Sequence, residues 1–396
     1  MNDPNDPLNW SPWRKGINFG LTSFYVLFTF VMLDILKVAF ESYMSELGIS
    51  YETLNEAVAT NYAGLAVGCL LFIPFVHKYG RRPFYMMSSL IQLVAAIWSA
   101  SLNSGGELIV SNLLSGIGGA TSETIVMITI VDLFFVHQHA RFNGLFLMMQ
   151  SLGAFGGPVA AGFIVADQGW RWMWWWTAIF LGVNFVLVCC FFEETKYIPA
   201  TVRQTPQAPA DSNPENETSR EKAYSHEHLE RIDIRTNLES EAAVPRRNPI
   251  SKRLAIITKS DISIRHHIYL PFKILFTFPA VAYTAFTYGL LLAWFAIISS
   301  ASSYFMLDPP YSFNSSSVGL FILSALIGAI LGTVTGAPLN DQSIMWLSRR
   351  NRGIFEPEMR LWMALPGSLL CTGGILIFGL GLSRVSIYVL VHNRGA

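Results

Sequence analysis

The sequence predicts an all-α polytopic membrane protein, and three observations lead to that prediction. Hydrophobic residues make up 52% of the chain and charged residues only 14%, whereas a soluble domain carries about a quarter charged residues. Apolar runs of about twenty residues, long enough to cross a bilayer as a helix, recur along the chain. Lys and Arg are concentrated in every second polar link between these runs. Because lipid offers no partner for backbone groups, each run is expected to be helical.

The apolar runs predict about nine spans in two groups. They are Ile17–Leu36, Leu54–Val76, Phe84–Leu102, Leu108–Phe135, Phe142–Ala166, Trp170–Phe192, Phe272–Ser299, Val318–Leu339 and Leu361–Leu382. The segment between the sixth and seventh spans is rich in Pro, Ser, Asn and mixed charge, which is typical of a disordered linker. Such a linker suggests two bundles joined by a tether.

This pattern divides the chain into five parts. We expect a cytoplasmic N-terminal tail (1–16), an N-terminal six-helix bundle (17–195), a disordered cytoplasmic linker (196–270), a partial C-terminal bundle of about three helices (271–382) and an aberrant tail (383–396). The linker could close with a short amphipathic stretch on the inner leaflet.

Positive charge predicts the orientation in the membrane. One set of links contains "WRKG", "HKYGRRPF" and "RRNRG", whereas "NSGGE", "DQG" and "LDPPYSFNSSS" contain no Lys or Arg. Cytoplasmic links are enriched in both residues, so the N-terminus and the central loop are predicted to be cytoplasmic. The expected location is the plasma membrane. Asn314, in "NSSS" on an outer link, is a predicted glycosylation acceptor.

Several functional classes find no support in the residues. The net charge of zero predicts no nucleic-acid partner, and the four cysteines all lie in apolar runs, where a thiol is usually a small buried hydrophobe. We find no metal-ligand spacing, no nucleophile triad and no phosphate-binding loop, since "GIGGATSE" lies inside a span with no strand before it. The sequence therefore predicts no enzyme activity, no cofactor and no metal, and we expect a monomer. The run "WRWMWWW" at 170–176 is typical of an aromatic belt at a membrane interface.

Ionisable residues inside spans are costly in lipid and are candidates for function. Asp34 and Lys37 are three residues apart and so share a helix face. One interpretation is a charge pair in the cavity or at an outer gate that binds substrate or a proton. The favoured one is a neutral pair at the outer interface, with Lys37 reaching towards the headgroups.

Glu123 lies midway along the fourth span, far from either interface. It could bind a cationic or polar group of a substrate or take up a proton, or it could make a structural hydrogen bond to another helix. Five further residues could line an amphipathic pocket, although most aromatic side chains in such helices contact lipid or core: Gln150, Asn184, Tyr283, Tyr288 and Trp294.

The link "IPFVHKYGRRP" resembles the pattern G-x-L-A-D-R-x-G-R-R/K of the major facilitator superfamily, specifically its fungal drug:proton antiporter-like members. Gly80, Arg81 and Arg82 match, whereas His77 stands where the family usually has Asp. "DPLNWSPWRK", "TIVDLFFVHQHARFNGL", "EETKY" and "RRNRGIFEPEMRLW" are also similar to these members, and together the motifs cover nearly all of residues 4–382. "SLGAFGGPVAAG" resembles the antiporter motif of the fifth helix, with the matching residues Gly153, Gly157, Pro158 and Gly162.

The resemblance implies twelve helices in two six-helix halves that give alternating access to a central cavity. The chain supplies six helices and then about three, so we expect a C-terminally truncated member. By resemblance, Arg81, Arg82 and Asp132 form an inner-gate cluster together with His77 and Gly80. The glycine and proline motif lets the fifth span bend and slide, or serves close packing alone. Asn112 stands where the family often has an Arg linked to proton transfer.

These expectations lead to one main functional hypothesis and two alternatives. The main one is proton-coupled efflux of a small amphipathic organic compound, such as a drug, toxin or fungal secondary metabolite. The alternatives are uptake or facilitated diffusion of a polar nutrient, and a non-transporting truncated remnant. In each case the lipid bilayer surrounds the chain.

Overall fold

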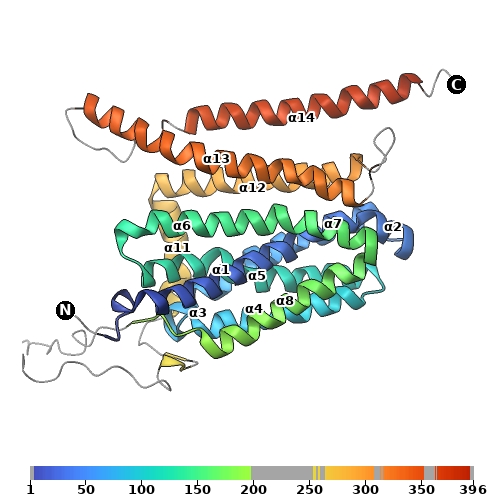
Figure 1. The fold of residues 1–396 in the computed structure, drawn as a ribbon. Helices are drawn as coiled ribbons and strands as arrows, with labels where there is room; N and C mark the ends of the chain where they lie inside the picture. Colours follow the sequence, from blue (N-terminus) through green and yellow to red (C-terminus); the bar gives the residue numbers. More distant parts are fainter. Residues whose placement is uncertain are drawn as a thin grey trace, which may run out of the picture.

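The computed structural model describes residues 4–197, 253–255, 257–258, 264–306, 313, 315–351, 362 and 364–392. Every secondary-structure element among them is helical. The helices of the first six spans form one bundle, and α12 (Pro279–Phe305), α13 (Ser315–Arg350) and α14 (Ala364–His392) lie along one side of it (Figure 1). We call these the first and the second bundle.

The first bundle accounts for the first six predicted spans. Its elements are η1 (Pro7–Asn9), α1 (Pro12–Asp34), η2 (Ile35–Ala39), α2 (Phe40–Leu47), α3 (Tyr51–Tyr79), α4 (Arg82–Ser101), α5 (Gly105–Leu133), α6 (Val136–Ser151), η3 (Leu152–Gly156), α7 (Gly157–Gln168) and α8 (Trp170–Phe191). The end that carries η2, α2 and the C-terminus of α7 is the predicted outer end. The end that carries the α3–α4 link is the predicted inner end.

Local signals explain several of these boundaries. The α3 helix begins after Ser50, whose hydroxyl accepts the N–H of Thr53 at 3.2 Å. The α5 helix begins after Ser104, whose hydroxyl accepts the N–H of Glu107 at 3.4 Å. The Glu107 carboxylate in turn accepts the N–H of Asn103 at 3.2 Å. Both caps satisfy N–H groups that a helix start leaves without an intrahelical partner.

The described residues contain eight helical segments long and apolar enough to cross a membrane. Helix α14 adds a ninth apolar helix, but its apolar part, Leu365–Gly381, is shorter than the others. The prediction of an all-α polytopic membrane protein is thus confirmed. Helix α14 continues through residues 383–392, so the predicted boundary at 382 lies inside a helix.

The predicted start of the seventh span at Phe272 is wrong. Residues up to Thr277 belong to a separate helix, α11 (Ile264–Thr277), and the span itself is α12, which begins at Pro279. Proline has no backbone N–H and disfavours helical geometry at the residue before it, so Phe278 separates the two helices. The predicted linker boundary at 270 likewise lies inside α11, and residues 198–252 of that linker are outside the described residues.

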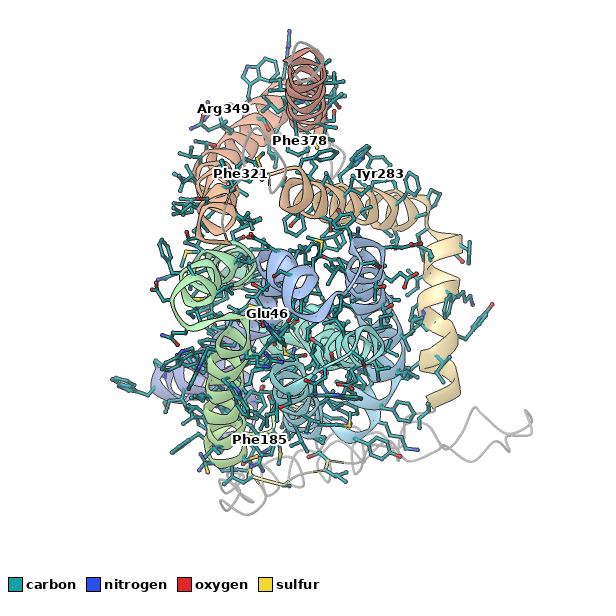
Figure 2. The ribbon with its side chains drawn as sticks, turned by 90° about the vertical axis from the view of Figure 1, so that its right-hand side faces the viewer. Glu46, Phe185, Tyr283, Phe321, Arg349 and Phe378 are labelled. Atoms are coloured by element: carbon teal, nitrogen blue, oxygen red, sulfur yellow. The ribbon has the colours of Figure 1, made fainter. Side chains whose placement is uncertain are left out.

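The two bundles contact each other mainly towards the predicted outer end. Helix α13 packs extensively against α7 and much less against α6, the inner half of the same span. Helix α12 contacts η2 in the first bundle. In Figure 1, α13 runs close to α7 and then diverges from α6, and α14 lies beyond it, farthest from the first bundle. In Figure 2, which looks along the bundles, α11 lies at one side of the first bundle.

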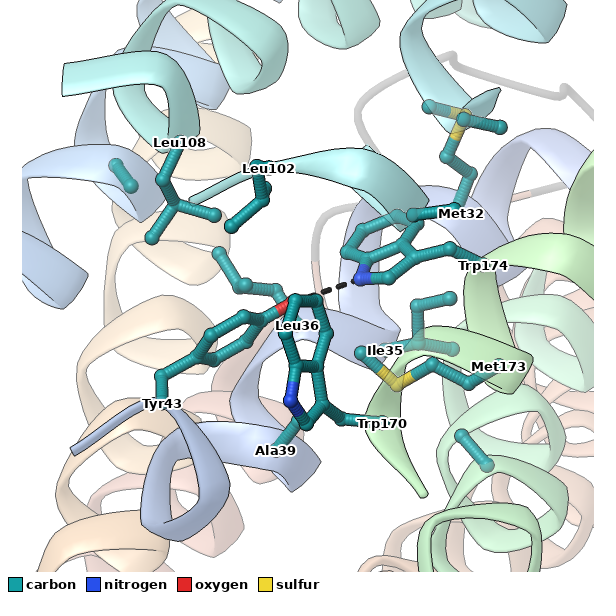
Figure 3. Close-up of a cluster of buried hydrophobic side chains, with 14 of the residues drawn as sticks. Met32, Ile35, Leu36, Ala39, Tyr43, Leu102, Leu108, Trp170, Met173 and Trp174 are labelled. Atoms are coloured by element: carbon teal, nitrogen blue, oxygen red, sulfur yellow. Dashed lines mark hydrogen bonds between the residues drawn. The ribbon is translucent and has the colours of Figure 1, made fainter. Parts of the chain in front are cut away.

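A cluster of buried side chains fills the first bundle near α2 (Figure 3). The Trp174 indole N–H donates a hydrogen bond of 2.7 Å to the Tyr43 hydroxyl. The Trp170 ring packs against the same Tyr43 ring at a centroid distance of 4.6 Å, with the two planes tilted by 53°. Both tryptophans are buried, whereas Trp172 and Trp176 are exposed. The belt interpretation of "WRWMWWW" is therefore wrong for Trp170 and Trp174, which are four residues apart and share the helix face that points inward.

Candidate functional site

Glu123 lies midway along α5 and faces the second bundle. One oxygen of its carboxylate accepts a hydrogen bond of 3.4 Å from the Gln150 amide on α6. The other accepts a bond of 3.4 Å from the Tyr288 hydroxyl on α12. The structure thus brings together Glu123, Gln150 and Tyr288, three of the predicted substrate-binding candidates, where the two bundles meet.

Among the described residues, no cation pairs with the Glu123 carboxylate. The ion pairs found in the described part of the chain involve other carboxylates and do not include this one. A carboxylate within a span needs a cation, a proton or water to offset the cost of leaving bulk solvent. This position is therefore suited to binding a proton or a cationic group of a ligand.

Asp34 and Lys37 form an ion pair at the η2 break of the first span. The Lys37 ammonium lies 2.9 Å from the Asp34 carboxylate and donates to the Tyr62 hydroxyl on α3 at 3.4 Å. Only 1% of the Lys37 side chain is exposed. The favoured interpretation of an interfacial lysine reaching towards the headgroups is thus wrong, because Lys37 packs inside the protein and its charge is offset by Asp34.

Both bundles contribute aromatic rings to Lys37. Its ammonium lies 5.7 Å from the centre of the Tyr62 ring in the first bundle and 5.3 Å from that of Phe295 on α12. Phe155 of η3 packs edge-on against Phe295 at 5.5 Å. Distances below about 6 Å allow a cation–π attraction. Phe295 and Tyr62 carry no charge, so the sequence held no signal for this site beyond Asp34 and Lys37.

The remaining substrate-binding candidates lie elsewhere. Asn112 is buried inside the first bundle, where its side-chain oxygen accepts a 3.3 Å hydrogen bond from Asn61. Tyr283 and Trp294 are 54% and 42% exposed. At about 100° per residue, neither shares the face of α12 that presents Tyr288 to the first bundle. The structure does not bring these three candidates to Glu123. Asn314, the predicted glycosylation acceptor, lies outside the described residues.

At the predicted inner end, Arg81 pairs with Asp132. The Arg81 Nε lies 2.9 Å from one Asp132 oxygen, and a second guanidinium nitrogen donates to the other at 3.4 Å. Thr195, just after α8, donates its hydroxyl to the same carboxylate at 3.2 Å. The predicted proximity of Arg81 and Asp132 is therefore present, and the chain after α8 completes the contact.

Glu194 holds the turn between α3 and α4. Its carboxylate accepts the backbone N–H groups of Arg81 at 2.9 Å, Arg82 at 3.2 Å and Lys196 at 2.9 Å. The Glu194 carboxylate fits there because Gly80 has no side chain. A Cβ at this position would lie only 2.8 Å from the carboxylate carbon. The φ of Gly80 is +102°, a conformation that side chains rarely adopt. These contacts explain why a glycine precedes the two arginines, which positive charge on the link could not.

Lys196 and His77 connect the end of α3 to neighbouring segments. The Lys196 ammonium donates to the carbonyl oxygens of His77 at 2.7 Å and Lys78 at 3.0 Å. Burial and the nearby Arg81 charge lower the pKa of Lys196 to about 8. The His77 ring lies 5.2 Å from that of His267 on α11, so this position links the α3–α4 turn to the helix that leads into the second bundle.

Glu193 receives two arginines from distant parts of the chain. Arg14 of α1 donates through Nε to its two carboxylate oxygens at 3.0 and 2.9 Å. Arg253, within the predicted linker, donates through Nε at 2.8 Å and through Nη2 at 2.5 Å. Burial alone would raise the pKa of Glu193, but the hydrogen bonds from Arg253 and Arg14 outweigh it and lower the pKa. Sequence reasoning missed the roles of Glu193 and Glu194; "EETKY" was their only signal.

The glycine and proline motif of the fifth span lies at the junction of η3 and α7. Pro158 has no N–H for the carbonyl four residues earlier, and the helix widens to the π form in η3. A Cβ on Gly157 would lie 2.9 Å from Val31 of α1. A Cβ on Gly319 of α13 would lie 2.8 Å from the Pro158 oxygen and 3.3 Å from the Gly162 Cα. The motif thus lets α1 and α13 approach closely from two sides, and bending during transport stays a prediction.

Comparison with known proteins identifies the family of this chain. The chain is 30% identical to an uncharacterized MFS-type transporter of Schizosaccharomyces pombe, over 96% of this chain and 70% of that protein. It is 29% identical to the protein HOL1 of Saccharomyces cerevisiae, over 96% and 72%. It is 26% identical to the efflux pump radE of Floropilus chiversii, over 95% and 64%.

Solved structures agree at the level of the fold. A crystal structure of a POT family transporter in complex with a thioalcohol-conjugated peptide aligns with a TM-score of 0.50 at 13% identity, covering 88% of this chain and 73% of that one. The model of the Major Facilitator Superfamily matches residues 22–392, nearly the whole chain. This protein therefore belongs to the Major Facilitator Superfamily and is a multi-pass membrane transporter.

Proposed function

We propose that this transporter exports a small amphipathic organic compound, such as a drug, toxin or fungal secondary metabolite, in exchange for protons. The compound crosses by alternating access, with the bundles opening first to the cytoplasm and then to the outside. The observation that carries the proposal is Glu123, a carboxylate within a span that is paired with no cation in the described residues and is bonded to Tyr288 across the bundle interface.

The exchange follows from the charge of this carboxylate. A Glu123 facing the outside accepts a proton, and on facing the cytoplasm it releases the proton and binds a cationic or polar group of the compound. Tyr288 and Gln150 offer hydrogen bonds to whichever state is present. Because a proton and a cationic group of the compound would each neutralise the same carboxylate, the two compete for it and their movements are coupled.

The names of relatives support the proposed direction of transport, and the charge of the links supports the proposed orientation in the membrane. One curated relative is named an efflux pump, radE of Floropilus chiversii, and another is the MFS transporter cpaT of Aspergillus oryzae, at 28% identity. Lys and Arg in alternate links favour a cytoplasmic N-terminus and central loop. The proposed location is the plasma membrane.

The test measures uptake of a panel of fluorescent amphipathic compounds into inside-out plasma-membrane vesicles that carry this chain. Acidifying the vesicle interior should drive accumulation, because protons leave the interior in exchange for the compound that enters. The variant Glu123→Gln keeps the shape of the side chain but cannot exchange a proton, so gradient-driven accumulation should fall about tenfold or more. Glu52→Gln, an exposed position at the start of α3, is the matched control and should behave as wild type.

Unchanged transport and pH dependence in Glu123→Gln would remove the proposed role of this carboxylate. Accumulation that ignores the imposed pH gradient, or that occurs only in right-side-out vesicles, would instead favour facilitated diffusion or uptake of a nutrient.

A further inference from the structure

The contact between the Lys37 ammonium and the Phe295 ring lies outside the Glu123 site, and its place along the spans suggests a separate role. Lys37 follows Asp34 in η2, towards the predicted outer end of the first span. Phe295 and Tyr288 are seven residues apart on α12, so they share a face of that helix about 10 Å apart along its axis. The Lys37 contact therefore lies on the outer side of the Glu123 site, along the same junction between the bundles.

The two bundles are closed against each other at this level. Beyond Phe295 along α12, the Ser300 carbonyl oxygen accepts a hydrogen bond of 3.3 Å from the Tyr51 hydroxyl of α3. Nearby, Gly319 of α13 sits against Pro158 and Gly162. At the inner end α13 makes far less contact with α6. The conformation is closed towards the predicted outside, and α12 must leave η2 for that side to open.

We propose that Lys37 is a positioning residue of the outer gate, holding the pathway closed through the attraction of its ammonium to the Phe295 ring. This inference rests on the proposed alternating access. Asp34 and Tyr62 fix the ammonium on the first bundle, at 2.9 and 3.4 Å, and its 5.3 Å distance from the Phe295 ring places the charge against the second. When α12 moves away, the ammonium keeps Asp34 and loses the ring, so opening costs the cation–π attraction.

The ion pair with Asp34 and the neutral Phe295 ring explain why Lys37 can stay buried where the two bundles separate. Asp34 moves with Lys37 because both belong to the same span, so their charges stay balanced in both conformations. Phe295 is neutral, so its departure leaves no uncompensated charge on α12. A contact of this type shifts an equilibrium by about two- to thirtyfold, which is enough to bias a gate without locking it.

The test uses a reporter cysteine on α12. In a chain with Cys69, Cys189, Cys190 and Cys371 replaced by Ser, Ser300→Cys is labelled on intact cells with a membrane-impermeant maleimide. Phe295→Leu should raise the labelling rate about two- to thirtyfold. Phe286→Leu is the matched control on the same helix, because Phe286 is 69% exposed, and it should leave the rate unchanged.

A double-mutant cycle separates the charge from simple packing. The paired variant Asp34→Asn/Lys37→Met removes the ammonium without stranding a buried carboxylate, and by itself it should also raise the rate. Phe295→Leu added to it should then have no further effect, because contacts that act through each other are not additive. The same increase from Phe295→Leu in both backgrounds would overturn the proposal, since packing against Phe155 would then explain it.

Fluorination provides a second measurement that preserves the shape of the side chain. Replacing Phe295 with trifluoro-phenylalanine withdraws charge from the ring face and should raise the labelling rate towards that of Phe295→Leu. An unchanged rate with the fluorinated ring would also overturn the proposal. Because labelling needs no substrate, this result is independent of whether Glu123 proves to carry transport.

Discussion

Gly80→Ala tests whether the α3–α4 turn depends on a residue without a side chain. Two separate costs follow from the structure. A side chain at φ +102° lies in a backbone region that costs about 1–3 kcal/mol. In addition, the new Cβ would occupy the place of the Glu194 carboxylate, which accepts the N–H groups of Arg81, Arg82 and Lys196.

The second cost depends on how many of these hydrogen bonds survive. A hydrogen bond to a charged group contributes about 1.5–3 kcal/mol, so losing one of the three brings the total to about 2.5–6 kcal/mol. Because large proteins often unfold irreversibly, the suitable readout is the temperature at which half of the monomer peak in detergent is lost. We expect that temperature to fall by about 5 °C or more.

The control and the rescue make this prediction specific. Gly144→Ala lies inside α6 with nothing within 4 Å of the added Cβ, and should be neutral or slightly stabilising. Adding Glu194→Ala to Gly80→Ala should relieve the steric part but leave the N–H groups unsatisfied, so recovery should be partial. A Gly80→Ala protein that melts within 1 °C of the Gly144→Ala control would refute the reasoning.

Three further predictions concern other contacts. Reversing the charge at Arg81 or at Asp132 alone should abolish transport, because breaking a buried ion pair costs about 3–5 kcal/mol. Exchanging the two residues should restore part of the transport. Charge reversals that neither abolish nor rescue transport would contradict the pairing. The lowered pKa of Glu193 means that the ionised carboxylate stabilises the fold fully above its ordinary pKa of 4.5, and that this stabilisation is lost as pH falls below that value. The difference in melting temperature between wild type and Glu193→Gln should therefore be largest at neutral pH and shrink under acid. A difference that stays constant with pH would contradict this prediction. Trp174→Phe should cost about 0.6–1.7 kcal/mol through the lost hydrogen bond to Tyr43, and Tyr43→Phe should cost nothing further in that background, as measured by melting temperature in detergent.

Properties that depend on neighbouring residues along the chain were within reach of the sequence. The span predicted at Trp170–Phe192 is α8, Trp170–Phe191, because bilayer thickness and hydropathy determine where such a helix begins and ends. The seventh span was misplaced because Phe272 and Phe276 continue the apolar run, and the break depends on Pro279. Hydropathy averaged over a window does not register a single proline.

The sequence by itself determined the class of protein, most of its spans and two intramembrane carboxylates, because composition and the cost of charge in lipid are local properties. Only the tertiary structure decided what those carboxylates face. Asp34 has Lys37 three residues away, but Phe295 reaches the pair from far along the chain, and Glu123 meets Tyr288 in the same way. Contacts of this kind depend on how the helices pack, and packing between helices in lipid follows close fit and hydrogen bonds that hydropathy does not encode.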